Sequence, residues 1–142
     1  MKDTGRTELY SQIKKQYRYE KYLDLKLDPF LKRNITAIRT SCHCLPIEYL
    51  RRKGIERKMR HCNLCQGNEI GTEMHVLTQC RNVEVSRLKC EFLQICIKLN
   101  SQYQNFRMED FMKLQLLGND TTTGYYFAVF LKKLFHLVQS SY

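Results

Sequence analysis

The feature that most constrains this chain is a set of three cysteines and one histidine within the stretch 60–81. Cys62 and Cys65 are separated by two residues, His75 and Cys80 by four, and nine residues lie between the two pairs. Zn²⁺ takes four sulfur and nitrogen ligands in a tetrahedron, and two cysteines at this short spacing can turn inward around one bend of the chain. The spacing therefore predicts one zinc ion held by Cys62, Cys65, His75 and Cys80.

The residues around the two pairs predict how the chain turns. Gly67 and Gly71 stand where a loop that wraps closely round an ion needs a positive φ. Five steps along an α-helix would carry Cys80 roughly 140° round from His75, so helical structure should begin near His75 and loosen before Cys80. Four protein ligands leave no open position, which predicts a structural metal site rather than a catalytic one. The alternative is four unrelated residues in a chain that is unusually rich in cysteine.

A second ligand set competes with the first. Cys42, His43 and Cys44 are close enough in sequence to replace one member of the set, but we prefer His75 because it completes the tetrahedron together with Cys80. A cysteine–histidine nucleophile pair drawn from Cys42–Cys44 is not expected, since neighbours on an extended segment point to opposite faces. The chain also has no adjacent aspartates and no P-loop. The sequence therefore predicts that the chain is not an enzyme on its own.

The charge of the chain points to a polyanionic partner. Its 142 residues include 24 Lys and Arg against 14 Asp and Glu, a formal net charge of +10 at pH 7, which favours nucleic acid, RNA or DNA. A basic run at 53–60 leads directly to Cys62, and a metal-bound loop would hold those charges in fixed positions. The alternative is a solvated basic face. The candidate phosphate contacts are Arg51, Arg52, Lys53, Arg57, Lys58 and Arg60.

The N-terminal stretch offers a weaker nucleic-acid signal. From 7 to 27 the pattern predicts a basic helix in which tyrosines such as Tyr10 and Tyr17 alternate with lysines and arginines. Such rings can stack on nucleobases while the charges hold phosphates. The alternative, which we prefer, is that the rings rest on the protein core.

Hydrophobic periodicity predicts a mainly α fold, a small helical domain with a zinc-stapled loop and little or no sheet. Asp28-Pro29 signals a helix start. Within 41–48, His43, Leu45 and Ile47 stand at every second position, which predicts an extended segment that Pro46 confines to an edge or a loop. The expected helices are 7–27, 29–40, one from Val85 to Leu99, 108–117 and 125–138. We expect one compact unit with N-terminal basic helices (1–40), a basic segment with the knuckle (41–82) and a C-terminal helical region (83–142).

Burial within these helices can also be predicted. The helix 125–138 is apolar on nearly every side, so it is a central core helix or an interface with a protein partner. Cys90 and Cys96 are expected as small buried residues, and His136 as a packing residue. The residues of the helix 29–40 that we expect to face inward are Phe30, Leu31, Ile35 and Ile38.

The cysteine count and the N-terminus indicate the compartment. Seven cysteines is an odd number, the first residues contain no apolar signal region, and no window is long and apolar enough to span a membrane. Paired cysteines in a reducing compartment hold metal more often than they form disulfides. We therefore expect an intracellular protein, nuclear or cytoplasmic, with no membrane partner.

A set of residues stands in a fixed order along the chain: Arg39, Ser41, His43, Leu45, Ile47, Glu48, Gly54, Ile55, Arg57, Arg60, Cys62, Cys65, Glu73, His75, Leu77 and Cys80. Over about 22–88 this order resembles the zinc-knuckle region C-terminal to the reverse transcriptase domain of non-LTR retrotransposon polyproteins. The resemblance implies that Cys62, Cys65, His75 and Cys80 bind metal. It also implies that the neighbouring arginines contact nucleic acid. In such polyproteins the region is thought to help hold template RNA and target DNA during copying.

Three functional hypotheses follow. The first is a zinc-binding, nucleic-acid-binding module left from a retrotransposon reverse transcriptase. The second is a zinc-stabilised helical domain with a structural or protein-interaction role and no nucleic acid. The third is a decayed fragment without a selected function. The basic cluster at 51–60 favours the first.

Overall fold

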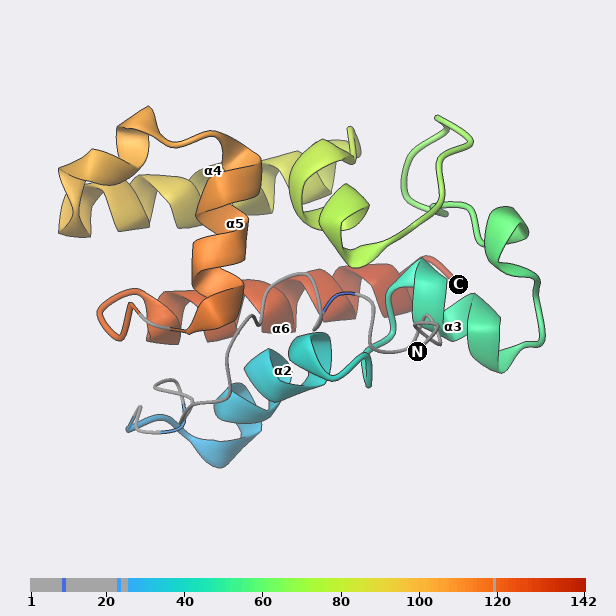
Figure 1. Cartoon of the computed structure of the whole chain (residues 1–142), viewed down its shortest axis with the longest axis horizontal. Helices are drawn as coiled ribbons and strands as arrows, with labels where there is room; N and C mark the ends of the chain where they lie inside the picture. Colours follow the sequence, from blue (N-terminus) through green and yellow to red (C-terminus); the bar gives the residue numbers. More distant parts are fainter. Residues whose placement is uncertain (1–8, 10–22, 24–25, 119) are drawn as a thin grey trace, which may run out of the picture.

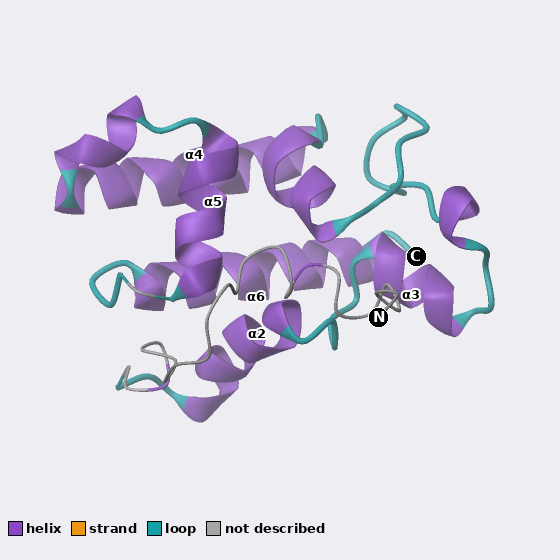
Figure 2. Ribbon diagram, in the orientation of Figure 1, coloured by secondary structure: helices purple, strands orange, loops and turns teal. Residues whose placement is uncertain are grey.

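The described part of the computed structural model consists of Leu9, Leu23, residues 26–118 and residues 120–142, and it is built mainly from α-helices (Figures 1 and 2). Within these residues there is no strand, and a single antiparallel bridge pairs His61 with Ile70. The predicted mainly α fold is confirmed. The predicted helix 7–27 lies outside the described residues except for Leu9, which is buried, Leu23, which is exposed, and Lys26 and Leu27. Lys26 and Leu27 are not helical, so the prediction is wrong at that end. The elements are α2 (Pro29–Arg39), α3 (Pro46–Arg52), η2 (Arg57–Met59), η3 (His75–Gln79), α4 (Val83–Leu99), η4 (Ser101–Asn105), α5 (Met108–Leu117) and α6 (Gly124–Ser140).

Helix α2 begins where its capping residues predict. Asp28 is the N-cap, and its side chain accepts a hydrogen bond of 2.8 Å from the backbone N–H of Phe30, which satisfies one free donor of the first turn. Ile35 and Ile38 are buried, but Phe30 is 74% exposed. The inward prediction for Phe30 is wrong because it precedes Ile35 by five residues, roughly 140° round the helix.

The segment 41–48 is not extended throughout, and this prediction is wrong from Pro46 onward. Leu45 is extended and acts as the N-cap of α3, with Pro46 in the first turn. Proline suits that position because its missing N–H has no partner there and its fixed φ matches the helix. Pro46 therefore starts a helix and does not mark an edge strand.

Helix α6 is the centre of the core, as its apolar composition predicts. Figure 1 shows it running between α4 and α2, with α5 crossing it. Phe127, Leu131 and Leu134 on α6 are fully buried or nearly so, and Phe130 stacks on Phe92 of α4 with ring centroids 5.1 Å apart. His136 is exposed, so its predicted packing role is wrong. The outward face of α6 is instead polar and basic.

Helices α4 and α5 end at the residues that the sequence indicates. Asn100 caps the C-terminus of α4, and Gly118 ends α5 with a φ of 68°, a left-handed conformation that glycine adopts without strain. Cys96 is buried as predicted, whereas Cys90 is exposed. Six residues separate these cysteines, roughly 240° of rotation, so they lie on different faces of the helix.

A buried tyrosine joins η4 to the loop before α6. The Tyr103 hydroxyl donates a hydrogen bond to Oδ2 of Asp120, whose Oδ1 accepts a bond of 3.0 Å from the backbone N–H of Thr122. Burial, together with the hydrogen bond to Asp120 and its negative charge, raises the pKa of Tyr103 to about 12. The phenol is therefore neutral at physiological pH and stays a donor.

We predict that Tyr103→Phe lowers the free energy of unfolding by about 1–2 kcal/mol near pH 7, because Asp120 loses a donor. The pKa of Tyr103 is higher in the folded chain than its ordinary value of 10.0, so its contribution is fully present below pH 10 and is lost as pH rises through about 12. Urea unfolding of parent and variant from pH 7 to pH 12 measures the difference. Tyr125→Phe, at an exposed tyrosine, is the control. A difference that stays constant across this range would contradict the assignment.

Candidate metal centre

The first two candidate ligands lie on a loop that is closed at its base by backbone hydrogen bonds. The N–H of Cys62 donates to the carbonyl of Glu69 at 2.8 Å, and the N–H of Gly71 donates to the carbonyl of Arg60 at 2.8 Å. With the His61–Ile70 bridge, these bonds hold the two ends of the loop side by side. The chain therefore reverses between Cys62 and Glu69, and Cys65 turns back toward the base of the loop.

The predicted positive φ at Gly67 and Gly71 is wrong. Gly71 is needed instead for its lack of a side chain. Within the loop it is Asn68 that adopts a positive φ, of 55°; asparagine tolerates this conformation better than most residues. A Cβ at Gly71 would lie 2.5 Å from Cβ of Pro46 and 3.1 Å from Cα of Cys62. Gly71 is needed because the loop packs directly against the start of α3.

The second pair of ligands is brought into line by a π-turn. His75–Gln79 form η3, in which the N–H of Cys80 donates to the carbonyl of His75 at 2.8 Å. This i to i+5 bond brings the chain round about once in five residues, whereas an α-helix would overshoot by roughly 140°. Cys80 itself is extended, with φ −60° and ψ 128°. The prediction that helical structure starts near His75 and loosens before Cys80 is confirmed.

The four predicted ligands meet at one point. The sulfurs of the three cysteines and a ring nitrogen of His75 all lie within 4.8 Å of one another. The Sγ atoms of Cys62 and Cys80 are 3.8 Å apart, and Sγ of Cys65 lies 3.3 Å from Nε2 of His75. A tetrahedron with metal–sulfur bonds of about 2.3 Å has sulfur–sulfur edges of about 3.8 Å. The donor set and its spacing are compatible with a tetrahedral metal site.

The protonation of the thiols gives this cluster its chemistry. Burial raises the pKa of Cys62 and, together with the charge of the neighbouring sulfurs, raises that of Cys80 to about 12. Burial also acts on Cys65, but the Gly67 N–H, His75 and the other two cysteines outweigh it and lower its pKa to about 7. Two of the three thiols are therefore neutral at pH 7 in the absence of a cation. A bound metal ion would displace their protons and stabilise all three as thiolates.

Neighbouring groups support the ligands. Oε2 of Glu69 lies 3.1 Å from Nδ1 of His75. Nε2 of this ring faces the cluster. If Nε2 bound a metal ion, Nδ1 would carry the ring proton, and a carboxylate beside that nitrogen is the usual outer partner of a metal-bound histidine. On the opposite side, Nζ of Lys89 donates to the carbonyl of Cys80 at 3.2 Å. Asn82 caps α4 and also donates to the carbonyl of Leu64 at 2.8 Å, which ties the loop to α4.

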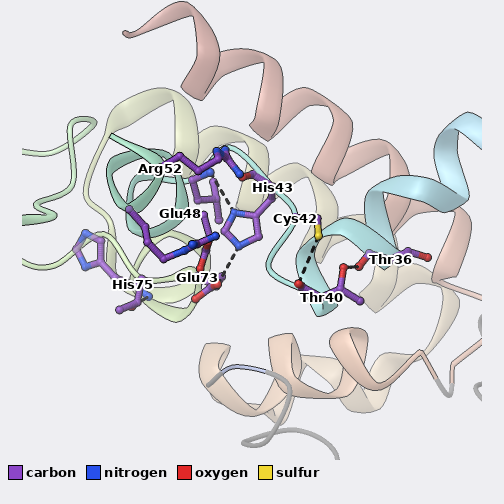
Figure 3. A network of polar contacts seen from close by, with 11 residues as sticks. Thr36, Thr40, Cys42, His43, Glu48, Arg52, Glu73 and His75 are labelled. Carbon is purple, nitrogen blue, oxygen red and sulfur yellow. Dashed lines mark hydrogen bonds and ion pairs between the residues drawn. The ribbon is translucent and has the colours of Figure 1, made fainter. Parts of the chain in front are cut away.

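The alternative histidine has another role. Nε2 of His43 lies 2.8 Å from Oε1 of Glu73, and Nδ1 accepts a bond of 3.1 Å from the N–H of Leu45. Since Nδ1 accepts, Nε2 must carry the proton and donate to the carboxylate. Figure 3 shows the His43 ring directed at Glu73, with His75 lying apart. His43 is thus outside the cluster, and it joins the loop before α3 to the segment that leads into η3.

Three of the predicted phosphate-contacting residues are held by the protein itself. Nε of Arg51 donates to Oε2 of the buried Glu48 at 2.6 Å. Arg52 donates to the carbonyl of His43 at 2.8 Å, and Arg60 donates to that of Ile55 at 2.8 Å. The first contact lies within α3, the second ties the end of α3 to the loop before it, and the third braces the segment between α3 and Cys62.

The other three predicted contacts, Lys53, Arg57 and Lys58, have exposed side chains on the same segment. Lys53 lies over the ring of Tyr49, 5.5 Å from its centroid. Lys58 lies 3.5 Å from Glu56, and both side chains are largely exposed, so this ion pair contributes little. Gly54, with a φ of 78°, bends the chain between the two halves of the run. A role of all six residues in phosphate binding stays a prediction.

No family model, curated protein or solved structure matches this chain. The resemblance to the retrotransposon zinc-knuckle region therefore stays a prediction that rests on the residues alone. Across the part of the chain that the structure describes, no helix has the length and apolarity to cross a membrane.

We call the stretch 60–71 the metal loop. We predict that Gly71→Ala destabilises it, because the new methyl group would overlap Pro46 and press on the backbone of Cys62. An overpacked site of this kind costs about 1–3 kcal/mol. Gly67→Ala is the matched control in the same loop, since its Cβ would have no neighbour nearer than 3.9 Å. Urea unfolding in the presence of zinc compares the two variants with the parent. Equal stability of the two variants would show that the loop does not pack on Pro46 as described.

Proposed function

We propose that this chain is a zinc-stapled helical module that binds nucleic acid, related to the C-terminal region of a non-LTR retrotransposon reverse transcriptase. The observation that carries the proposal is the meeting of Cys62, Cys65, His75 and Cys80 within 4.8 Å. Three thiolates and one imidazole favour zinc, a borderline-soft ion that accepts a closed tetrahedron without redox chemistry. The ion would have a structural role, because the four protein ligands leave no position for substrate.

The first prediction of this proposal concerns the metal. The purified parent should contain one zinc per chain by elemental analysis, and a strong chelator should unfold the stretch 60–81, since metal binding supplies folding free energy there. Cys62→Ser should lose the zinc. Cys90→Ser is the control, because Cys90 is exposed on α4, and it should keep one zinc. A parent that contains no zinc and keeps its fold would refute the zinc assignment.

The support for nucleic acid comes from charge and position. The whole chain has a formal net charge of +10, and the exposed Lys53, Arg57 and Lys58 lie between α3 and the knuckle. Backbone hydrogen bonds hold both ends of their segment, from Ile55 to Leu50 at 3.0 Å and from Arg60 to Arg57 at 3.1 Å. A braced basic segment loses less conformational entropy on binding phosphate than a loose one. Such contacts add affinity without reading base sequence.

A second candidate function is a zinc-stabilised structural or protein-interaction domain. The observation that favours it is the internal bonding of Arg51, Arg52 and Arg60, which gives these arginines a bracing role without nucleic acid. The most apolar residues of α6 are buried inside the chain, so a protein partner of that helix would meet its polar outward face. Nucleic-acid titration separates the two candidates.

We predict that Arg57→Ala/Lys58→Ala weakens binding to a mixed-sequence duplex and to a single strand alike. Arg60 is left in place because it holds Ile55. Each phosphate contact contributes about 0.9 to the slope of log affinity against log salt for a duplex, so the double variant should flatten that slope by about two units. Zinc content should not change.

The control is Lys98→Ala/Arg107→Ala, which removes the same charge. Lys98 lies near the C-terminus of α4, about 24 Å along the helix from Asn82, the cap that contacts the metal loop. Arg107 directly precedes α5. This variant should bind with the parent's salt slope. If the Arg57/Lys58 variant matches the parent at every salt concentration, the basic run is only a solvated face and the second candidate function takes its place.

A further inference from the structure

The outward face of α6 forms the floor of a long groove, with α2 on one side and α4 on the other. This groove has a volume of about 1000 Å³. A second hollow of about 640 Å³ lies between α2, α3 and the C-terminal end of α6. The two hollows share Asn34, Phe135 and Gln139 in their walls, so they adjoin one another. We call the combined feature the α6 groove; it reaches Arg52, beside the basic segment of the knuckle.

The α6 groove is strongly basic. Lys132 and Lys133 are exposed on its floor, and Arg33 and Arg52 lie along its walls. One carboxylate, that of Glu84, lines the groove, and it is paired with Arg87 at 2.7 Å. Among the described residues, no carboxylate lies within ion-pair distance of Lys132 or Lys133. Within the part of the chain that the structure describes, Lys132 and Lys133 have no acidic counterpart, which favours an anionic occupant.

Aromatic rings are exposed along the same groove. Tyr125 at one end is 47% exposed and Phe30 in the other part is 74% exposed, although both are large apolar groups. The guanidinium of Arg33 lies 5.9 Å from the centroid of the Phe30 ring. Exposed rings and cations in one groove suit a single strand, because unpaired bases stack on the rings while the cations hold phosphates.

We propose that the α6 groove binds single-stranded nucleic acid and extends the contact surface that starts at the basic segment of the knuckle. This inference rests on the proposed function. A duplex would meet the cations but could not offer its bases to Tyr125 or Phe30, since its bases are stacked on one another. The floor of the groove from Tyr125 to Gln139 is about 21 Å long, which is about six nucleotides at the 3.4 Å spacing of one strand in a duplex.

Fluorescence anisotropy with a labelled oligothymidylate of 20 nucleotides, at several salt concentrations, tests the inference with the zinc-loaded full chain. Tyr125→Ala should weaken binding about fivefold or more, since stacking on an aromatic ring is of this order. Lys132→Ala/Lys133→Ala should flatten the salt slope by about 1.4 units, about 0.7 for each lost phosphate contact on a single strand. The Lys98→Ala/Arg107→Ala control should keep the parent's affinity.

A second measurement uses the parent alone, so it does not depend on how the variants fold. Ultraviolet crosslinking of an oligonucleotide that contains 5-iodouracil, followed by mass spectrometry, should place crosslinks at Tyr125 or Phe30. If the parent binds and the Arg57/Lys58 variant weakens binding, while the groove variants bind as the parent does and the crosslinks fall outside the groove, the inference is overturned and the proposed function stands. A protein partner would then be the better occupant. A parent that binds no oligonucleotide overturns both.

Discussion

Three thiols and one imidazole lie within 4.8 Å of one another, an arrangement that a bound cation would stabilise. Burial keeps Cys62 and Cys80 protonated when no cation is bound, and ordering the loop costs conformational entropy. A tetrahedral ion would displace the protons of these two thiols and form four bonds, so that metal affinity would become folding free energy. Two local features bring the four ligands together: the π-turn that begins at His75 and the backbone hydrogen bonds that close the base of the loop.

The metal loop is connected to the helical core on several sides. Gly71 packs on Pro46, and its carbonyl accepts from the N–H of Ile47 at 3.0 Å. The buried His43–Glu73 pair joins the loop before α3 to the segment leading into η3, and Asn82 caps α4 while it bonds to Leu64. Because these contacts meet at the loop, the loss of metal should loosen α3 and the basic segment as well. On this account, the position of the basic residues would also depend on a bound ion.

The sequence predicted those features that residues close together in the chain determine. Ligand spacing indicated the cluster, Asp28-Pro29 indicated the start of α2, and Gly118 indicated the end of α5, since caps and knuckles act within a few residues. Pro46 was misread because proline suits both an edge and a first helical turn, and only its contact with Gly71, from another part of the chain, decides between them.

Partners far apart in sequence were not predictable in the same way. The pairing of His43 with Glu73 and the contact of Glu69 with His75 needed the closed loop to be known. A signal did exist for Glu48, one of two acidic residues in the basic stretch from 32 to 60: a carboxylate among so many cations usually has a bracing partner, and here it is Arg51. The basic outward face of α6 was hidden by the apolar composition of that helix.

X-ray absorption spectroscopy at the zinc edge on the purified protein tests the central claim most directly. We predict three sulfur neighbours at about 2.3 Å and one nitrogen neighbour at about 2.0–2.1 Å, with no oxygen in the first shell. Two sulfurs with two lighter neighbours, or a shell that includes water, would contradict a closed site formed by Cys62, Cys65, His75 and Cys80.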